Sequence, residues 1–111
     1  HGDFHPGNIL ITSSEPCIID WIDSALGNPL ADVARTTIIL LGAAYQQVDS
    51  PLLRAFVRLF HAIYLKTYFH NSPGGLEEYN KWLPIVAAAR LSEGIQELES
   101  WLVEQAYPLK E

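Results

Sequence analysis

The chain is poor in several features that would assign it to particular classes of protein. It has one cysteine, Cys17, so it cannot form an internal disulfide, which fits a reducing cytosol. Its longest apolar run, residues 38–45, is far shorter than the roughly 20 residues that a membrane-spanning helix requires. With 7 Lys and Arg against 13 Asp and Glu, its net charge of −6 argues against a nucleic-acid-binding surface. These absences predict a cytoplasmic protein that binds neither nucleic acid nor membrane.

The composition is typical of one folded domain. The 111 residues suffice for a modest core, and 49% hydrophobic with 18% charged residues argues against intrinsic disorder. Two short β-branched runs, residues 9–12 (ILIT) and 17–19 (CII), flank four turn residues and predict a hairpin. Cys17 falls within the second run, and we expect it to be a buried, inert thiol. Residues 24–29 (SALGNP) then predict a loop.

The rest of the chain is patterned for helices. The first helical segment is apolar around most of its circumference, which predicts burial in the core, and Ser50 with Pro51 predicts the start of the second, amphipathic segment. Pro84 could kink the third segment, Gly94 separates it from the last, and Pro108 follows. The glutamates between residues 77 and 104 are expected mostly on solvated helix faces, although together they could attract a polyamine. The four helical segments cover residues 30–47, 51–71, 76–93 and 96–106. The predicted fold class is therefore α+β and predominantly helical.

The strongest chemical signal lies at the two ends of the hairpin. The first eight residues, HGDFHPGN, place Asp3 and Asn8 before the first strand, and Asp20 follows the second strand in the run IIDW. Because a hairpin brings its ends together, Asn8 and Asp20 are expected to share one site. Carboxylate and amide oxygens are the ligands that Mg²⁺ prefers, and a free carboxylate can orient a hydroxyl and accept its proton. The pattern favours Mg²⁺ on a nucleotide at Asn8 and Asp20, with Asp3 as the catalytic base.

HGDFHPGN followed by IIDW resembles the catalytic segments of the aminoglycoside phosphotransferase and choline kinase family, which shares the protein-kinase fold. The resemblance implies that Asp3 is the catalytic Asp and that Asn8 and Asp20 hold Mg²⁺. Trp21 then stands where protein kinases have the Phe of D-F-G.

The resemblance implies roles for further residues. His1 takes the place of the motif histidine, which is mainly structural, and His5 falls where Ser/Thr protein kinases place a phosphate-contacting Lys. Asp32, in the run GNPLADVA, matches an acid that begins a buried helix and steadies the catalytic loop through backbone hydrogen bonds. Asp23 has no such match, and it could reach a second Mg²⁺ or a substrate amine, or be a solvated loop acid.

By this resemblance the chain is the C-terminal catalytic lobe of a small-molecule kinase, with residues 1–111 as a single domain. We expect the nucleotide-binding lobe, which would precede His1, to be absent, and the chain alone to turn over little. The full-length enzyme is expected to move the γ-phosphate of ATP or GTP to a hydroxyl of a small molecule such as an aminoglycoside. The sequence contains no segment like the A-P-E activation loop, which argues against a protein acceptor.

Two other functions fit part of the same pattern. A catalytically silent kinase-like binding module would keep the fold, although the intact set of Asp3, Asn8 and Asp20 argues against it. A metal-dependent hydrolase could use His1, Asp3 and His5 as alternate ligands on one strand face. Against the hydrolase, the Pro-Gly pair that follows His5 interrupts such a strand.

Overall fold

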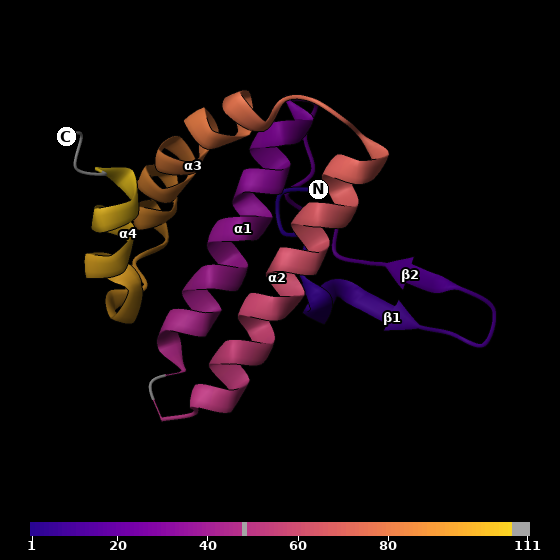
Figure 1. Ribbon diagram of the computed structural model, residues 1–111, viewed down its shortest axis with the longest axis horizontal. Helices are drawn as coiled ribbons and strands as arrows, with labels where there is room; N and C mark the ends of the chain where they lie inside the picture. The colour runs from indigo at the N-terminus through magenta and orange to yellow at the C-terminus, as the bar shows by residue number, and fades with distance from the viewer. Residues whose placement is uncertain (48, 108–111) are drawn as a thin grey trace.

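Helix α1 lies at the centre of the fold, with α2 against one side and the α3–α4 pair against the other (Figure 1). The structure, a computed structural model, describes residues 1–47 and 49–107. The elements are η1 (Pro6–Asn8), β1 (Ile9–Ile11), β2 (Pro16–Ile18), α1 (Pro29–Gln46), α2 (Pro51–Asn71), α3 (Leu76–Arg90), η2 (Leu91–Glu93), η3 (Gln96–Leu98) and α4 (Glu99–Ala106). The predicted architecture, a hairpin followed by four helical segments, is confirmed. Pro108 lies outside the described residues.

Helix α1 begins where its sequence favours a helix start. The side chain of Asn28 caps the helix by accepting a hydrogen bond of 2.9 Å from the backbone N–H of Leu30, and Pro29 occupies the first turn. Burial covers much of its circumference, as the apolar pattern predicted. The core that forms around it consists of Val33, Ala34, Ile38, Tyr79, Val86, Ala87, Leu98 and Leu102, contributed by α1, α3, η3 and α4. Helix α1 is therefore a rigid platform enclosed by the other helices.

Helix α2 has the predicted bounds but packs in an unexpected way. Ser50 caps its start by accepting a hydrogen bond from the N–H of Leu53. None of its 21 residues is fully buried. It packs on the core through partly buried residues that include Tyr64 and Tyr68, while an apolar stripe faces outward at Leu52, Phe56, Leu59, Phe60 and Ile63. In the described part of the chain, no helix has the length and apolar content needed to cross a membrane.

The hairpin projects away from the helices (Figure 1). Its strands are antiparallel, with Ile9 opposite Ile18 and Ile11 opposite Pro16. Strand β2 therefore begins at Pro16, one residue earlier than predicted. The prediction that Cys17 is a buried thiol is wrong, because its side chain is exposed. A two-stranded ribbon hides an apolar side chain only where another element packs on its face, and all of β2 is exposed.

A chain of buried and partly buried polar groups joins α1, α2 and α3. The hydroxyl of Thr37 lies 3.0 Å from Nε2 of His61 and 2.8 Å from the hydroxyl of Tyr79. Burial lowers the pKa of His61 from its usual 6.5, because the charged imidazolium loses water contact. Burial raises the pKa of Tyr79 for the same reason, and the hydrogen bond with Thr37 partly offsets this. The three helices are thus joined through neutral side chains.

The lowered pKa of His61 predicts acid sensitivity. The neutral imidazole stabilises the fold above the unfolded-state pKa of 6.5, and this stabilisation is lost as the pH falls through the lower folded-state value. We expect the free energy of unfolding to fall more between about pH 7.5 and about pH 5 in the wild type than in His61→Gln. Urea denaturation at both pH values measures the difference. Equal pH dependence in the two proteins would contradict the assignment.

Candidate functional site

Helix α1 holds the HGDFHPGN loop (residues 1–8) through Asp32, in its first turn. Oδ1 of Asp32 accepts a hydrogen bond of 2.8 Å from the backbone N–H of Gly2, and Oδ2 lies 3.2 Å from the backbone nitrogen of His1. Both oxygens of one carboxylate therefore bind consecutive backbone nitrogens. A carboxylate at a helix N-terminus is also stabilised by the helix dipole. The loop is in this way fixed to the most buried helix.

The ring of His1 joins the loop to the segment after β2. Its Nδ1 lies 3.2 Å from the backbone nitrogen of Asp3, and its Nε2 lies 2.9 Å from the carbonyl oxygen of Ile19. The neutral tautomer with its proton on Nε2 satisfies both bonds. The ring also packs against Trp21, with ring centroids 4.5 Å apart. Since both ring nitrogens are occupied, His1 is not placed to be a metal ligand, which argues against the hydrolase alternative.

Asn8 is directed at Asp3. Its side-chain nitrogen donates to the carbonyl oxygen of Asp3 at 2.8 Å and to the carboxylate Oδ2 at 3.2 Å. Asn8 is only 7% exposed, so its orientation is fixed by its surroundings. Nε2 of His5 lies 3.5 Å from the other carboxylate oxygen of Asp3, and Nδ1 of His5 accepts from the N–H of Gly7 at 3.1 Å. The amide nitrogen of Asn8 is thus used by Asp3, and its amide oxygen is the atom that can serve as a ligand.

The hairpin register brings the backbone that precedes Asp20 next to Asn8. The N–H of Ile19 donates to the carbonyl oxygen of Asn8 at 2.9 Å, so Asp20 stands one residue beyond the last backbone bond of the ribbon. Its φ of +61° lies in the left-handed region, which Asp tolerates better than most residues but which still costs about 1–2 kcal/mol. Its side chain is exposed. Backbone strain of this kind is concentrated at functional sites.

The oxygen donors of Asn8 and Asp20 fit Mg²⁺, which takes hard oxygen ligands and retains several from water or phosphate. In residues 1–47 and 49–107, no group of three or more His, Cys, Asp and Glu side chains is arranged to hold a metal ion. A cation here would therefore depend on one amide and one carboxylate together with oxygens from outside the protein. Such incomplete protein coordination is usual where the cation binds phosphates of a nucleotide.

A polar pocket of about 850 Å³ opens beside Asp3, and Asp23, Asp32, Arg35 and Glu93 also line it. Asp32 is engaged by the loop backbone, and Glu93 forms an ion pair with Arg35. Asp3 and Asp23 are the remaining acids of the lining, so the pocket favours a cationic occupant. The volume suits a small molecule rather than a macromolecule. The structure thus brings Asp23 into the same pocket as Asp3.

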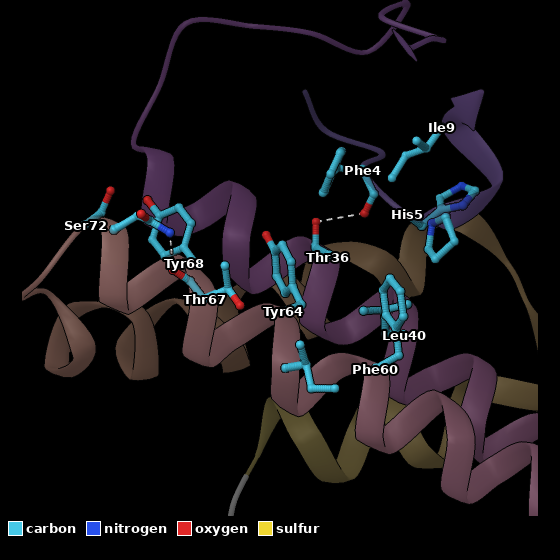
Figure 2. Close-up of a pocket in the computed structure, with 13 residues that line it drawn as sticks. Phe4, His5, Ile9, Thr36, Leu40, Phe60, Tyr64, Thr67, Tyr68 and Ser72 are labelled. Atoms are coloured by element: carbon cyan, nitrogen blue, oxygen red, sulfur yellow. Dashed lines mark hydrogen bonds between the residues drawn. The ribbon is translucent and has the colours of Figure 1, made fainter. Parts of the chain in front are cut away.

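An apolar pocket of about 420 Å³ is lined by other residues of the same loop together with residues of α1 and α2. Figure 2 shows Phe4 and His5 from the loop facing Thr36, Tyr64 and other helix residues across it. The hydroxyl of Thr36 donates to the carbonyl oxygen of Phe4 at 2.9 Å. Burial raises the pKa of Tyr64 to about 12. His5 lines this apolar cavity and also lies 3.5 Å from the Asp3 carboxylate, so its ring borders both.

The sequence that forms the loop, the hairpin and the buried helix matches a family of phosphate-transferring enzymes. The family model described as "Phosphotransferase enzyme family" (APH) matches residues 1–79, which is more than half of the chain. The chain belongs to this family, that of the aminoglycoside phosphotransferases, and has its protein-kinase-like fold. Searches of curated proteins and of solved structures gave no match.

Two residues of the polar pocket were not singled out from the sequence. Arg35 stands three positions after Asp32, and this helical spacing places both on one face of α1, which is a signal that could have been used. Glu93 was grouped with the solvated glutamates, but it forms an ion pair with Arg35, 58 residues earlier in the chain. No local sequence pattern predicts a contact between positions so far apart in the chain. Glu93 also lies outside the part of the chain that the family model matches.

Gly2 is the loop position that we expect to tolerate substitution least. Its φ is +84°, and a Cβ there would lie 2.9 Å from the backbone oxygen of Asp23. Gly2→Ala should lower the free energy of unfolding by about 1–3 kcal/mol, because it combines a strained backbone with a clash. Gly27→Ala is the matched control, because a Cβ there meets nothing within 4 Å. Denaturant titration of both variants tests this, and equal losses would contradict the assigned strain.

Proposed function

We propose that the chain is the catalytic lobe of a kinase that transfers the γ-phosphate of ATP or GTP to a hydroxyl of a small molecule. Membership of the phosphotransferase family supports the general reaction. The observation that carries the proposal is the pair of hydrogen bonds from the side-chain nitrogen of Asn8 to the carbonyl oxygen and carboxylate of Asp3. This contact holds a potential base at a fixed distance from a potential cation ligand. By family resemblance, a nucleotide-binding lobe that precedes His1 completes the enzyme.

In the proposed reaction, Asp3 orients the acceptor hydroxyl toward the terminal phosphorus of the nucleotide. A bond forms between the acceptor oxygen and that phosphorus, while the bond to the oxygen bridging the β and γ positions breaks. The nucleoside diphosphate leaves with the electron pair of the broken bond, and the hydroxyl proton passes to the Asp3 carboxylate. Asn8 keeps that carboxylate in place through the 3.2 Å bond to Oδ2.

We assign the cation site to the amide oxygen of Asn8 and the carboxylate of Asp20. When bound there, Mg²⁺ would neutralise phosphate charge and hold the phosphates in one orientation. Support comes from the donor chemistry of the two side chains and from the backbone bond between Ile19 and Asn8, which joins their segments. His5, 3.5 Å from Asp3, is a proposed contact for the transferred phosphate.

For the acceptor we propose a small molecule that carries an amine, in the way that aminoglycosides do. The polar pocket that Asp3 lines also holds Asp23, and neither carboxylate is neutralised there by the Arg35–Glu93 pair. An ammonium group paired with Asp23 would place a neighbouring hydroxyl near Asp3. A second Mg²⁺ is the competing ligand for Asp23, and the acceptor experiment below separates the two.

The first test is Mg²⁺-dependent phosphate transfer by the full-length protein to a panel of aminoglycosides and small alcohols. Asp3→Asn should lower kcat by at least about 100-fold while leaving nucleotide affinity nearly unchanged, because it removes the base without touching the cation site. Asp20→Asn should weaken Mg²⁺-nucleotide binding as well as kcat.

The matched control for this test is Glu77→Gln, which alters an exposed acid on α3 and should change neither quantity. Normal turnover in both Asp variants would disprove the mechanism. Absence of Mg²⁺-dependent nucleotide binding in the wild type would favour the silent module instead.

The role of Asp23 is tested through the acceptor. Asp23→Asn should raise the KM for an amine-bearing acceptor by about tenfold and leave kcat within about twofold, because it removes an ion pair made equally in ground and transition states. Against an uncharged alcohol of similar size the same variant should behave as wild type. A change in the Mg²⁺ dependence, with no change in the acceptor KM, would assign Asp23 to a second cation.

A further inference from the structure

Both polar groups of the Gly2 residue are bound by side chains of α1. The N–H donates to Oδ1 of Asp32 at 2.8 Å, and the carbonyl oxygen accepts from Nε of Arg35 at 3.1 Å. Asp32 and Arg35 lie one helical turn apart, so they hold Gly2 from two points on one rigid element. The carbonyl carbon of Gly2 is bonded to the backbone nitrogen of Asp3. Fixing this carbonyl therefore limits how the backbone of Asp3 can rotate.

Arg35 is itself held from a distant part of the chain. Its Nη2 forms an ion pair and hydrogen bond with Oε1 of Glu93, the last residue of η2. The Arg35 side chain is 24% exposed and that of Glu93 is 36% exposed, so solvent screens the pair only in part. Nε of Arg90 lies 3.8 Å from the second oxygen of Glu93, which places a further positive charge beside it. Glu93 thus links α1 to the end of α3.

We propose that Arg35, oriented by Glu93, is a positioning residue that sets the placement of the Asp3 carboxylate for phosphoryl transfer. This inference rests on the proposed function of Asp3. A guanidinium is suited to the task because it is planar and can donate from Nε and from Nη2 to two partners at once. A lysine ammonium at the end of a flexible chain does not hold this fixed pair of directions. Glu93 thereby gives the C-terminal part of the chain, beyond residues 1–79, a role in the site.

The expected effect is on turnover rather than on binding. In the full-length protein, Arg35→Lys keeps the charge opposite Glu93 but should lower kcat by about 10- to 100-fold, because small displacements of a catalytic group are costly. The KM values for nucleotide and acceptor should stay within about twofold, since the groups proposed to bind them are unchanged. Glu93→Gln keeps an oxygen that accepts from Arg35, so its kcat should fall less than that of Glu93→Ala.

A charge exchange separates positioning from simple stabilisation. The double variant Arg35→Glu with Glu93→Arg re-forms an ion pair between positions 35 and 93, so its melting temperature should exceed that of Arg35→Glu alone. It should stay below that of the wild type, because the exchange also removes the contact of Glu93 with Arg90. The double variant cannot restore kcat, because a glutamate at position 35 has no N–H to donate to the carbonyl oxygen of Gly2. Glu77→Gln, which removes an exposed ion pair with Lys81 on α3, is the control and should leave kcat unchanged.

The possible results separate the two proposals. Wild-type kcat in Arg35→Lys, or recovery of kcat in the charge exchange, would overturn the positioning role. A loss confined to KM would also overturn it. If Asp3→Asn abolishes turnover while Arg35→Lys is normal, the proposed function stands and the inference fails. If Asp3→Asn is fully active, the proposed function itself fails, whatever Arg35 does.

Discussion

The carboxylate of Asp32 connects the buried helix α1 to the HGDFHPGN loop, and the candidate site depends on this connection. A loop of eight residues with two glycines has little regular structure of its own, so its shape must be imposed by contacts. Asp32 supplies two of them by facing the backbone nitrogens of His1 and Gly2. The helix that carries Asp32 is enclosed by three others, so the loop takes its position from the least mobile part of the fold.

The remaining contacts extend this arrangement in two directions. His1 fixes the segment after β2 through a hydrogen bond with the carbonyl oxygen of Ile19, and Asn8 fixes Asp3 through a hydrogen bond to its carbonyl oxygen. Catalytic groups that are placed on loops work well when rigid elements hold those loops. The first three residues of the loop line the polar pocket and the next three line the apolar pocket, so neighbouring parts of one loop border a charged and an apolar cavity. The model of the phosphotransferase family matches residues 1–79, and the hydrogen bonds of His1, Asn8 and Asp32 all lie within this range.

Local patterns in the sequence were enough to predict the hairpin and the helical segments, although α3 ends at Arg90 and α4 begins at Glu99, with 3-10 turns in the rest of the predicted ranges. Helix caps such as Ser50, and the glycines and prolines between segments, act over a few residues and can be seen in the sequence. The neighbourhood of the segments that carry Asn8 and Asp20 could be predicted for the same reason, because one hairpin joins them. Burial was predicted less well. Cys17 is exposed because nothing in the described chain packs on its strand, and a strand's own sequence does not say what covers it.

Asp20 has a backbone conformation with a consequence for sequence variation. Its φ of +61° is readily adopted by Gly, Asn and Asp, and among these only Asp carries a charge. Glu would keep the charge but fits the left-handed backbone less well, whereas Asn would keep the backbone and lose the charge. With the proposed cation site at Asp20, two independent requirements, one conformational and one electrostatic, select the same amino acid. Almost every substitution at such a position is therefore expected to impair the site, even though the side chain of Asp20 is exposed to solvent.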